Sequence, residues 1–211
     1  MLLSLGVPGT GLFGVMDDVV RFAHLIAIAI GFGTVVSTDF LSVWRADKPL
    51  TAEYLRAVEA AHFVIVPALV VAWITGICLI GMLTGFDPAE FTTKLWVKLA
   101  VVTQLVVTAC LIKRFVMPIL RLNEGHTLME VPLGDKLVMA FCAGMSMAGW
   151  GSAILLGGLA MAKLVPGWLL IAAIVGLHIA VVNVALWSAV SLHDRVRVRA
   201  QRVRLAEIRG Y

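Results

Sequence analysis

The stretch VVRFAHLIAIAIGFGTVVSTDFLSVW, residues 19–44, decides the fold of this chain. About 20 mostly apolar residues are enough to cross a bilayer as a helix, and this run is longer than that. It carries His24 near one end and Asp39 near the other. Ionisable groups inside a spanning helix are costly and usually face the protein interior. The stretch therefore predicts a membrane helix with polar groups that need a structural or chemical explanation.

The composition of the whole chain agrees with a membrane protein. Hydrophobic residues make up 61% of the 211 residues and charged residues only 14%, and the mean hydropathy is +0.98. Soluble domains have about 45–50% apolar and about 25% charged residues. No long polar, Pro-rich or Ser-rich linker divides the chain, so we expect a single membrane domain over residues 1–211.

Five apolar runs are long enough to span, which predicts an all-α bundle of five transmembrane helices. They cover about residues 19–43, 60–83, 95–117, 137–162 and 166–192. Residues 1–16 lack a basic region and contain four glycines and a proline, so we expect an irregular or interfacial lead-in rather than a signal peptide.

The distribution of basic residues predicts the orientation. Basic side chains follow the first span (Arg45, Lys48, Arg56), the third span (Lys113, Arg114, Arg121, Lys136) and the fifth span, in the Arg-rich tail of residues 193–211. With five spans these segments share one side, and the positive-inside rule puts that side in the cytoplasm. We expect a bacterial-type inner membrane, the N-terminus outside, and anionic lipids rather than nucleic acid at the tail.

Some residues predict packing rather than chemistry. The cysteines form no C-x-x-C pair, and we expect all three to be small buried core residues. They are Cys78, Cys110 and Cys142. In the fourth span a stripe of small residues predicts close helix packing. It comprises Cys142, Ser146, Gly149 and Ala153. Asn183 and Trp187 share a face of the fifth span and predict a contact between helices, with Trp187 as an interface anchor.

One candidate site lies toward the predicted outer side. Counted at 1.5 Å per residue, His24 and Lys98 lie at similar depths and His178 lies deeper, near the middle of the fifth span. Imidazole is a good axial ligand for haem iron, and the lysine could pair with a propionate or a substrate carboxylate. The functional interpretation is a haem or redox site, with His24 and His178 as candidate iron ligands, and we weigh it slightly below the structural alternative. The structural alternative is a histidine bonded to a neighbouring helix and a lysine that reaches the interface.

A second candidate site lies toward the cytoplasmic side. Asp39 and His62 are both near the inner ends of their helices. Asp39 lies about 22 Å along the first helix from His24, so the two candidate sites are separate. Together they could relay protons or anchor a quinone head group. The alternative, which we favour, is an ion pair or hydrogen bond that ties two helices together.

The third span begins LWVKLAVVTQLVV, residues 95–107, and the second contains LVVAWITGICLIG, residues 69–81. This pattern resembles the W-x-K helix of small membrane proteins of the HemJ-type and CopD-type group, over about residues 20–117. HemJ-type proteins are oxygen-independent protoporphyrinogen oxidases that bind haem b. The resemblance implies that His24 and Lys98 form the functional pair, with Trp96 marking the motif. The family has four spans, so the fifth span with His178 has no counterpart in it.

These observations favour a membrane redox protein with a haem b, porphyrin or quinone site. The alternative is a non-catalytic accessory subunit that packs in a larger membrane complex or a homo-oligomer. A small transporter is disfavoured because the chain has no inverted repeat and no pair of broken helices.

Overall fold

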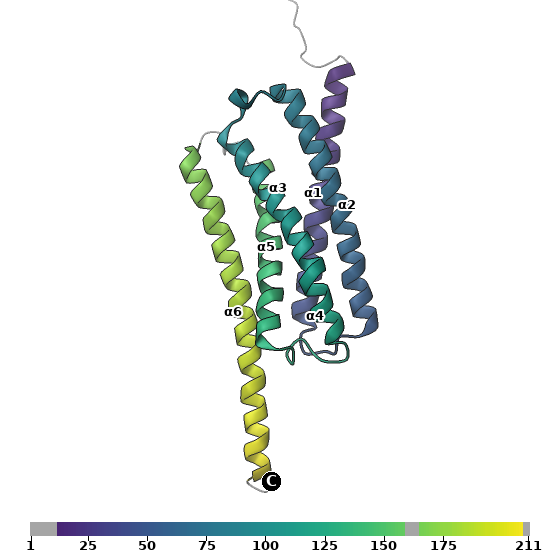
Figure 1. Cartoon of the computed structure of the whole chain (residues 1–211), viewed down its shortest axis with the longest axis vertical. Helices are drawn as coiled ribbons and strands as arrows, with labels where there is room; N and C mark the ends of the chain where they lie inside the picture. Colours follow the sequence, from purple (N-terminus) through teal and green to yellow (C-terminus); the bar gives the residue numbers. More distant parts are fainter. Residues whose placement is uncertain (1–11, 159–164, 209–211) are drawn as a thin grey trace, which may run out of the picture.

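The structure, a computed structural model, describes residues 12–158 and 165–208 and the side chains of residues 14–158 and 165–194. This part of the chain is all-helical (Figure 1). The elements are α1 (Leu12–Trp44), α2 (Ala52–Thr84), η1 (Pro88–Glu90), α3 (Thr93–Leu111), η2 (Ile112–Val116), α4 (Met117–Leu122), α5 (Leu133–Gly158) and α6 (Gly167–Ile208). Five segments are long and apolar enough to cross a membrane, which confirms the predicted number of spans.

The five long segments run up and down, so α1 begins at one end of the bundle and α6 finishes at the other (Figure 1). The third segment is Thr93–Leu122, in which α3, η2 and α4 follow one another without a break. An odd number of crossings places the two described ends on opposite sides. Which side faces the cytoplasm stays a prediction from the charge pattern.

The helices extend beyond the predicted apolar spans. The first helix begins at Leu12 and the second at Ala52, where the Thr51 side chain caps the helix by accepting a hydrogen bond from the Tyr54 N–H (3.3 Å). Part of the expected lead-in is therefore helical. Apolar runs mark the part of a helix inside the bilayer, whereas polar turns extend past it. The predicted end of the fourth span at residue 162 lies outside the described residues, and α6 continues through Ile208 into the basic tail.

The third span also continues past its predicted end, through Pro118. Proline cannot donate a backbone hydrogen bond and its ring clashes with the carbonyl four residues earlier. Directly before Pro118 the helix widens into the π-helical turn η2, in which the Met117 N–H bonds to the Ile112 carbonyl. The wider turn accommodates the proline, so the helix continues to Leu122.

Helix α5 lies at the centre of the bundle, and its small residues allow close packing. An added Cβ at Gly31 would overlap the Trp150 ring, and one at Gly144 would lie 3.0 Å from the Val182 Cα of α6. The predicted packing stripe is confirmed, because all of its members are buried: Cys142, Ser146, Gly149 and Ala153. The expectation of buried cysteines is wrong for two of the three. Cys78 and Cys110 are exposed on faces that lipid would cover, where an apolar side chain costs nothing.

At one end of the bundle two connections are held together, and we call residues 45–51 and 123–132 the loop clasp. The Leu50 N–H donates to the His126 carbonyl (2.8 Å), and the Leu50 carbonyl accepts from the Gly125 N–H (3.0 Å). A second link joins the Met129 N–H to the Ala46 carbonyl (3.3 Å). Leu50 is only 2% exposed and packs in one cluster with Tyr54, Leu55, Met117 and Leu120. The clasp thus fixes the ends of four spans relative to one another.

Candidate functional site

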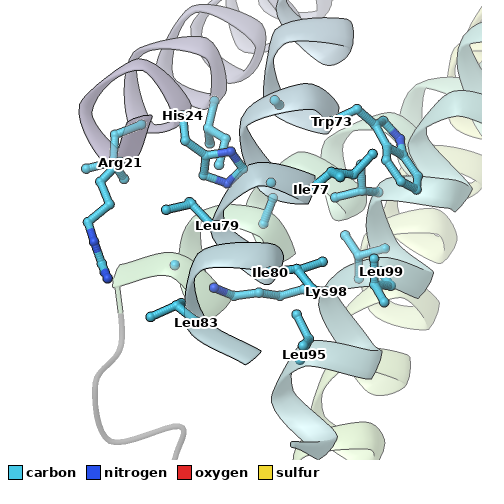
Figure 2. Close-up of a pocket in the computed structure, with 18 of the residues that line it drawn as sticks. Arg21, His24, Trp73, Ile77, Leu79, Ile80, Leu83, Leu95, Lys98 and Leu99 are labelled. Carbon is cyan, nitrogen blue, oxygen red and sulfur yellow. The ribbon is translucent and has the colours of Figure 1, made fainter. Parts of the chain in front are cut away.

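A cavity of about 330 Å³ lies between α1, α2, α3 and α5, and we call it the His24 pocket. Its volume falls near the lower end of the range of about 300–1,000 Å³ usual for ligand pockets. Most of its lining is apolar. The ionisable groups in the lining are Arg21, His24 and Lys98. Figure 2 shows them gathered on one side of the pocket, with Trp73, Ile77 and Leu99 on the other. A mostly apolar cavity with a few convergent polar groups is typical of a ligand site.

The geometry around His24 assigns its tautomer. Its Nδ1 lies 2.9 Å from the Thr75 Oγ1. The Thr75 hydroxyl donates to the Val71 carbonyl at 2.6 Å, so its oxygen is left to accept a hydrogen bond from His24 Nδ1–H. In a neutral imidazole with the proton on Nδ1, the Nε2 atom carries the lone pair. The network therefore orients the ring with Nε2 as the nitrogen that can bind a metal or accept a proton, an arrangement common among metal-ligating histidines.

Cations gather at the pocket on the side of His24. Lys98 reaches from α3 into the pocket, and its charge is close enough to act on the His24 imidazole. Arg21, one turn before His24 on α1, has its Nε held by the Asp17 carboxylate at 2.7 Å. The rigid guanidinium fork is well suited to carboxylates and phosphates. A ligand with an apolar body and acidic groups therefore fits this lining.

The sequence predicted His24 and Lys98 in one site, and the structure places both in one pocket. The sequence-based prediction did not include Thr75, Trp73 or Arg21. Arg21 could have been found, because a residue three positions before His24 shares its helix face. Thr75 could not, since nothing in the sequence gives the register of α2 against α1.

His178 and Trp96 lie elsewhere. Both line a groove of about 490 Å³ between α3 and α6, on another side of α3 from the His24 pocket. The His178 Nδ1 lies 2.9 Å from the Ile174 carbonyl of its own helix. Trp96 is 55% exposed and contacts Phe91 in a tilted arrangement, with ring centroids 5.3 Å apart. The structure therefore does not bring His24 and His178 together, because α3 lies between their two sites.

The second predicted pair is not joined either. Asp39 and His62 are both half-buried, but no hydrogen bond or ion pair links them among the described side chains. The charge that acts on His62 comes from Lys113. Near Asp39, the Tyr54 hydroxyl instead bonds to Ser42 Oγ at 2.7 Å. This hydrogen bond joins α1 to α2, whereas the predicted bond between Asp39 and His62 is not found among the described side chains.

The His24 pocket can be tested for its fit to haem b. The pocket lining contains the His24 imidazole, whose Nδ1 is engaged by Thr75, and the cationic residues Arg21 and Lys98, which could bind acidic groups. Two glycines in the lining leave room: a Cβ at Gly76 would lie 3.5 Å from the His24 Cε1, and one at Gly157 would meet nothing within 4 Å. A second imidazole is missing from the pocket lining. The described residues contain no cluster of three or more His, Cys, Asp or Glu that could hold a bare metal ion. The residues present thus fit a tetrapyrrole held through one histidine. The cavity of about 330 Å³ is smaller than such a ring system, so part of the ring would extend out of the pocket.

Comparison with known proteins finds no matching family model, curated protein or solved structure. The resemblance to HemJ-type proteins therefore rests on the motif around Trp96 and Lys98 and stays a prediction.

Proposed function

We propose that this protein is a membrane redox protein that binds haem b or a porphyrin in the His24 pocket. The observation that carries the proposal is the His24 imidazole, whose Nδ1 is engaged by Thr75 so that Nε2 is left for a ligand. A structural histidine on a helix face would need only one such bond, whereas this one also borders a cavity with two cationic neighbours.

Each polar group has a defined task in this proposal. His24 would hold the iron of a haem through Nε2, or would accept a proton there when a porphyrin is bound. Lys98 and Arg21 bind the acidic side groups and fix the orientation of the ring, and the apolar residues of α2 and α3 exclude water from it. The bound tetrapyrrole supplies the one-electron chemistry.

The visible absorption spectrum of the purified protein tests the proposal. We expect a Soret band that shifts on reduction, and His24→Ala should remove it or reduce haem binding at least tenfold. His178→Ala is the matched control, since it removes another intramembrane histidine that borders a different groove. A folded preparation that neither contains nor takes up haem or porphyrin would overturn the proposal. Stable co-purification of such a colourless protein with a larger assembly would favour the accessory-subunit alternative.

The proposed role of Lys98 can be tested by measuring how tightly modified porphyrins bind. A porphyrin with free carboxylates should bind more tightly than its methyl ester, and Lys98→Met should abolish that preference. Lys94, one turn earlier on α3, is absent from the pocket lining, so Lys94→Met serves as the control. If both variants keep the preference, Lys98 does not bind the acidic groups.

A further inference from the structure

Helix α6 carries a face that no other part of the described chain covers. Five residues on it, Ala172, Gly176, Ala180, Asn183 and Trp187, are all exposed. At 100° per residue they lie within an arc of about 80°. Trp187 is 72% exposed, and a Cβ added to Gly176 would meet no heavy atom within 4 Å. The sequence predicted a contact between helices at Asn183 and Trp187, and no other described helix makes that contact.

Asn183 makes this face unusual. It lies about 4 Å along the helix from the centre of the apolar segment Gly167–Asp194, where an uncovered side chain faces lipid. Its Nδ2 donates to the Ile179 carbonyl of its own helix at 2.7 Å. No donor to the amide oxygen is found among the described residues, and hydrocarbon offers none. Asparagine at such a position drives helices together.

We propose that the α6 face is the interface of a homodimer in which Asn183 pairs with Asn183 of a second copy. In a two-fold dimer whose axis is normal to the membrane, the same residue lies at the same depth in both copies. The amide is both donor and acceptor, so two such groups satisfy each other. A different partner would have to supply a polar group at that depth. The small residues Ala172, Gly176 and Ala180 let the two backbones approach closely.

The first test measures the oligomeric state in lipid nanodiscs or bilayers by single-molecule photobleaching. We expect two copies per complex, and Asn183→Leu should raise the dimer dissociation constant about 3- to 30-fold. Thr103→Val is the matched control, since Thr103 is also an exposed polar residue of a spanning helix bonded to its own carbonyl four residues earlier, Leu99 (2.8 Å). A monomer at every protein density, or a dimer that Asn183→Leu leaves unchanged, would overturn the proposal.

The second test locates the interface. In a background with Cys78, Cys110 and Cys142 replaced by alanine, Trp187→Cys should give a disulfide-linked dimer on mild oxidation. Phe63→Cys, at a position 79% exposed on α2, should stay monomeric under the same conditions. Equal crosslinking at both positions would show random collision and contradict the assignment of α6. Neither test depends on the His24 pocket, so a negative result for the dimer would not contradict the proposed redox function, and the reverse also holds.

Discussion

The His24 pocket and the loop clasp lie at opposite ends of the same bundle and use their polar groups differently. In the loop clasp the polar groups are paired: Leu50 bonds to Gly125 and His126 through the backbone. The Met129 carbonyl accepts a hydrogen bond of 2.5 Å from the buried Lys136, which lies next to the clasp on α5. In the His24 pocket the Thr75 hydroxyl holds the imidazole through Nδ1, and no side-chain hydrogen bond to Nε2 is found among the described residues.

This difference shows how to distinguish polar groups that hold the fold from polar groups that are available to a ligand in a helical membrane protein. Burial alone does not do it, since Lys136 is only 5% exposed and yet its ammonium group is used to hold a loop. The useful criterion is whether the side chain still has a hydrogen-bond donor or acceptor without a partner in the folded protein, and whether a cavity lies beside that atom. By that criterion changes in the loop clasp should alter stability, and changes in the pocket should alter ligand binding.

The largest expected effect is on stability, from Leu50→Ala in the loop clasp. Leu50 is 2% exposed in the cluster that joins the connections to α2 and α4. Removing such a side chain from a packed core costs about 2–5 kcal/mol. Thermal or chemical unfolding in detergent would measure this loss. Leu83→Ala, at a residue of the pocket lining that is 64% exposed, is the control and should cost much less. Similar losses of unfolding free energy in both variants would contradict the proposed difference between the loop clasp and the pocket.

The next effect is on ligand binding, from Thr75→Val in the His24 pocket. The change keeps the shape of the side chain but removes the acceptor of the His24 Nδ1 proton. Loss of such a partner lowers metal affinity about 10- to 100-fold, so haem titration should show a dissociation constant raised by that factor. Thr34→Val removes a hydroxyl bonded only to its own helix, at Ile30 (2.7 Å), and should leave affinity unchanged. Unchanged affinity in Thr75→Val would show that Thr75 does not orient the ring.

A smaller effect on stability is expected from the hydrogen bond between Tyr54 and Ser42. Tyr54 is 6% exposed and its hydroxyl joins α2 to α1. Tyr54→Phe should cost about 0.5–1.5 kcal/mol, and Ser42→Ala should add little in the double variant because both changes remove the same bond. Fully additive losses in the double-mutant cycle would show that the two groups are not coupled in the membrane. Haem binding should not change in either variant.

More of the fold than of the candidate site could be predicted from the sequence. Length and apolarity determine the number of spans, because a bilayer imposes both. Depth along a helix also follows from residue counting, which is why His24 and Lys98 were predicted to meet. Rotation and neighbour order do not follow from counting. His178 was predicted as a partner of His24, yet α3 separates them, and the distance between two helices across a bundle is a property of packing alone.

The same limit explains the partners that sequence reasoning missed. Thr75 and Tyr54 lie on α2, whose register against α1 depends on how Ala72 and Leu69 pack against Ala27 and Ile28. Only one polar group was predictable from its own helix, namely Arg21 beside His24. Polar residues on one helix can thus be grouped from sequence, whereas groups that span two helices need the packed structure.

The smallest expected effect comes from Glu130, at the water-exposed end of the loop clasp. The Thr127 backbone N–H donates to its carboxylate at 2.8 Å, and together with the Thr127 hydroxyl this lowers the pKa of Glu130 below its ordinary value of 4.5. A carboxyl with a lowered pKa in the fold stabilises the fold at pH values above its unfolded pKa, and that contribution is lost as the pH falls through the folded pKa. Glu130→Gln should therefore lower the midpoint of thermal unfolding slightly at neutral pH, and the difference from the unmodified protein should vanish in acid, at pH values below the lowered pKa of Glu130. The same comparison for Glu124→Gln, a neighbouring exposed carboxylate of the clasp, is the control. A difference for Glu130→Gln that persists in acid would mean that the charged hydrogen bond is not what holds this turn.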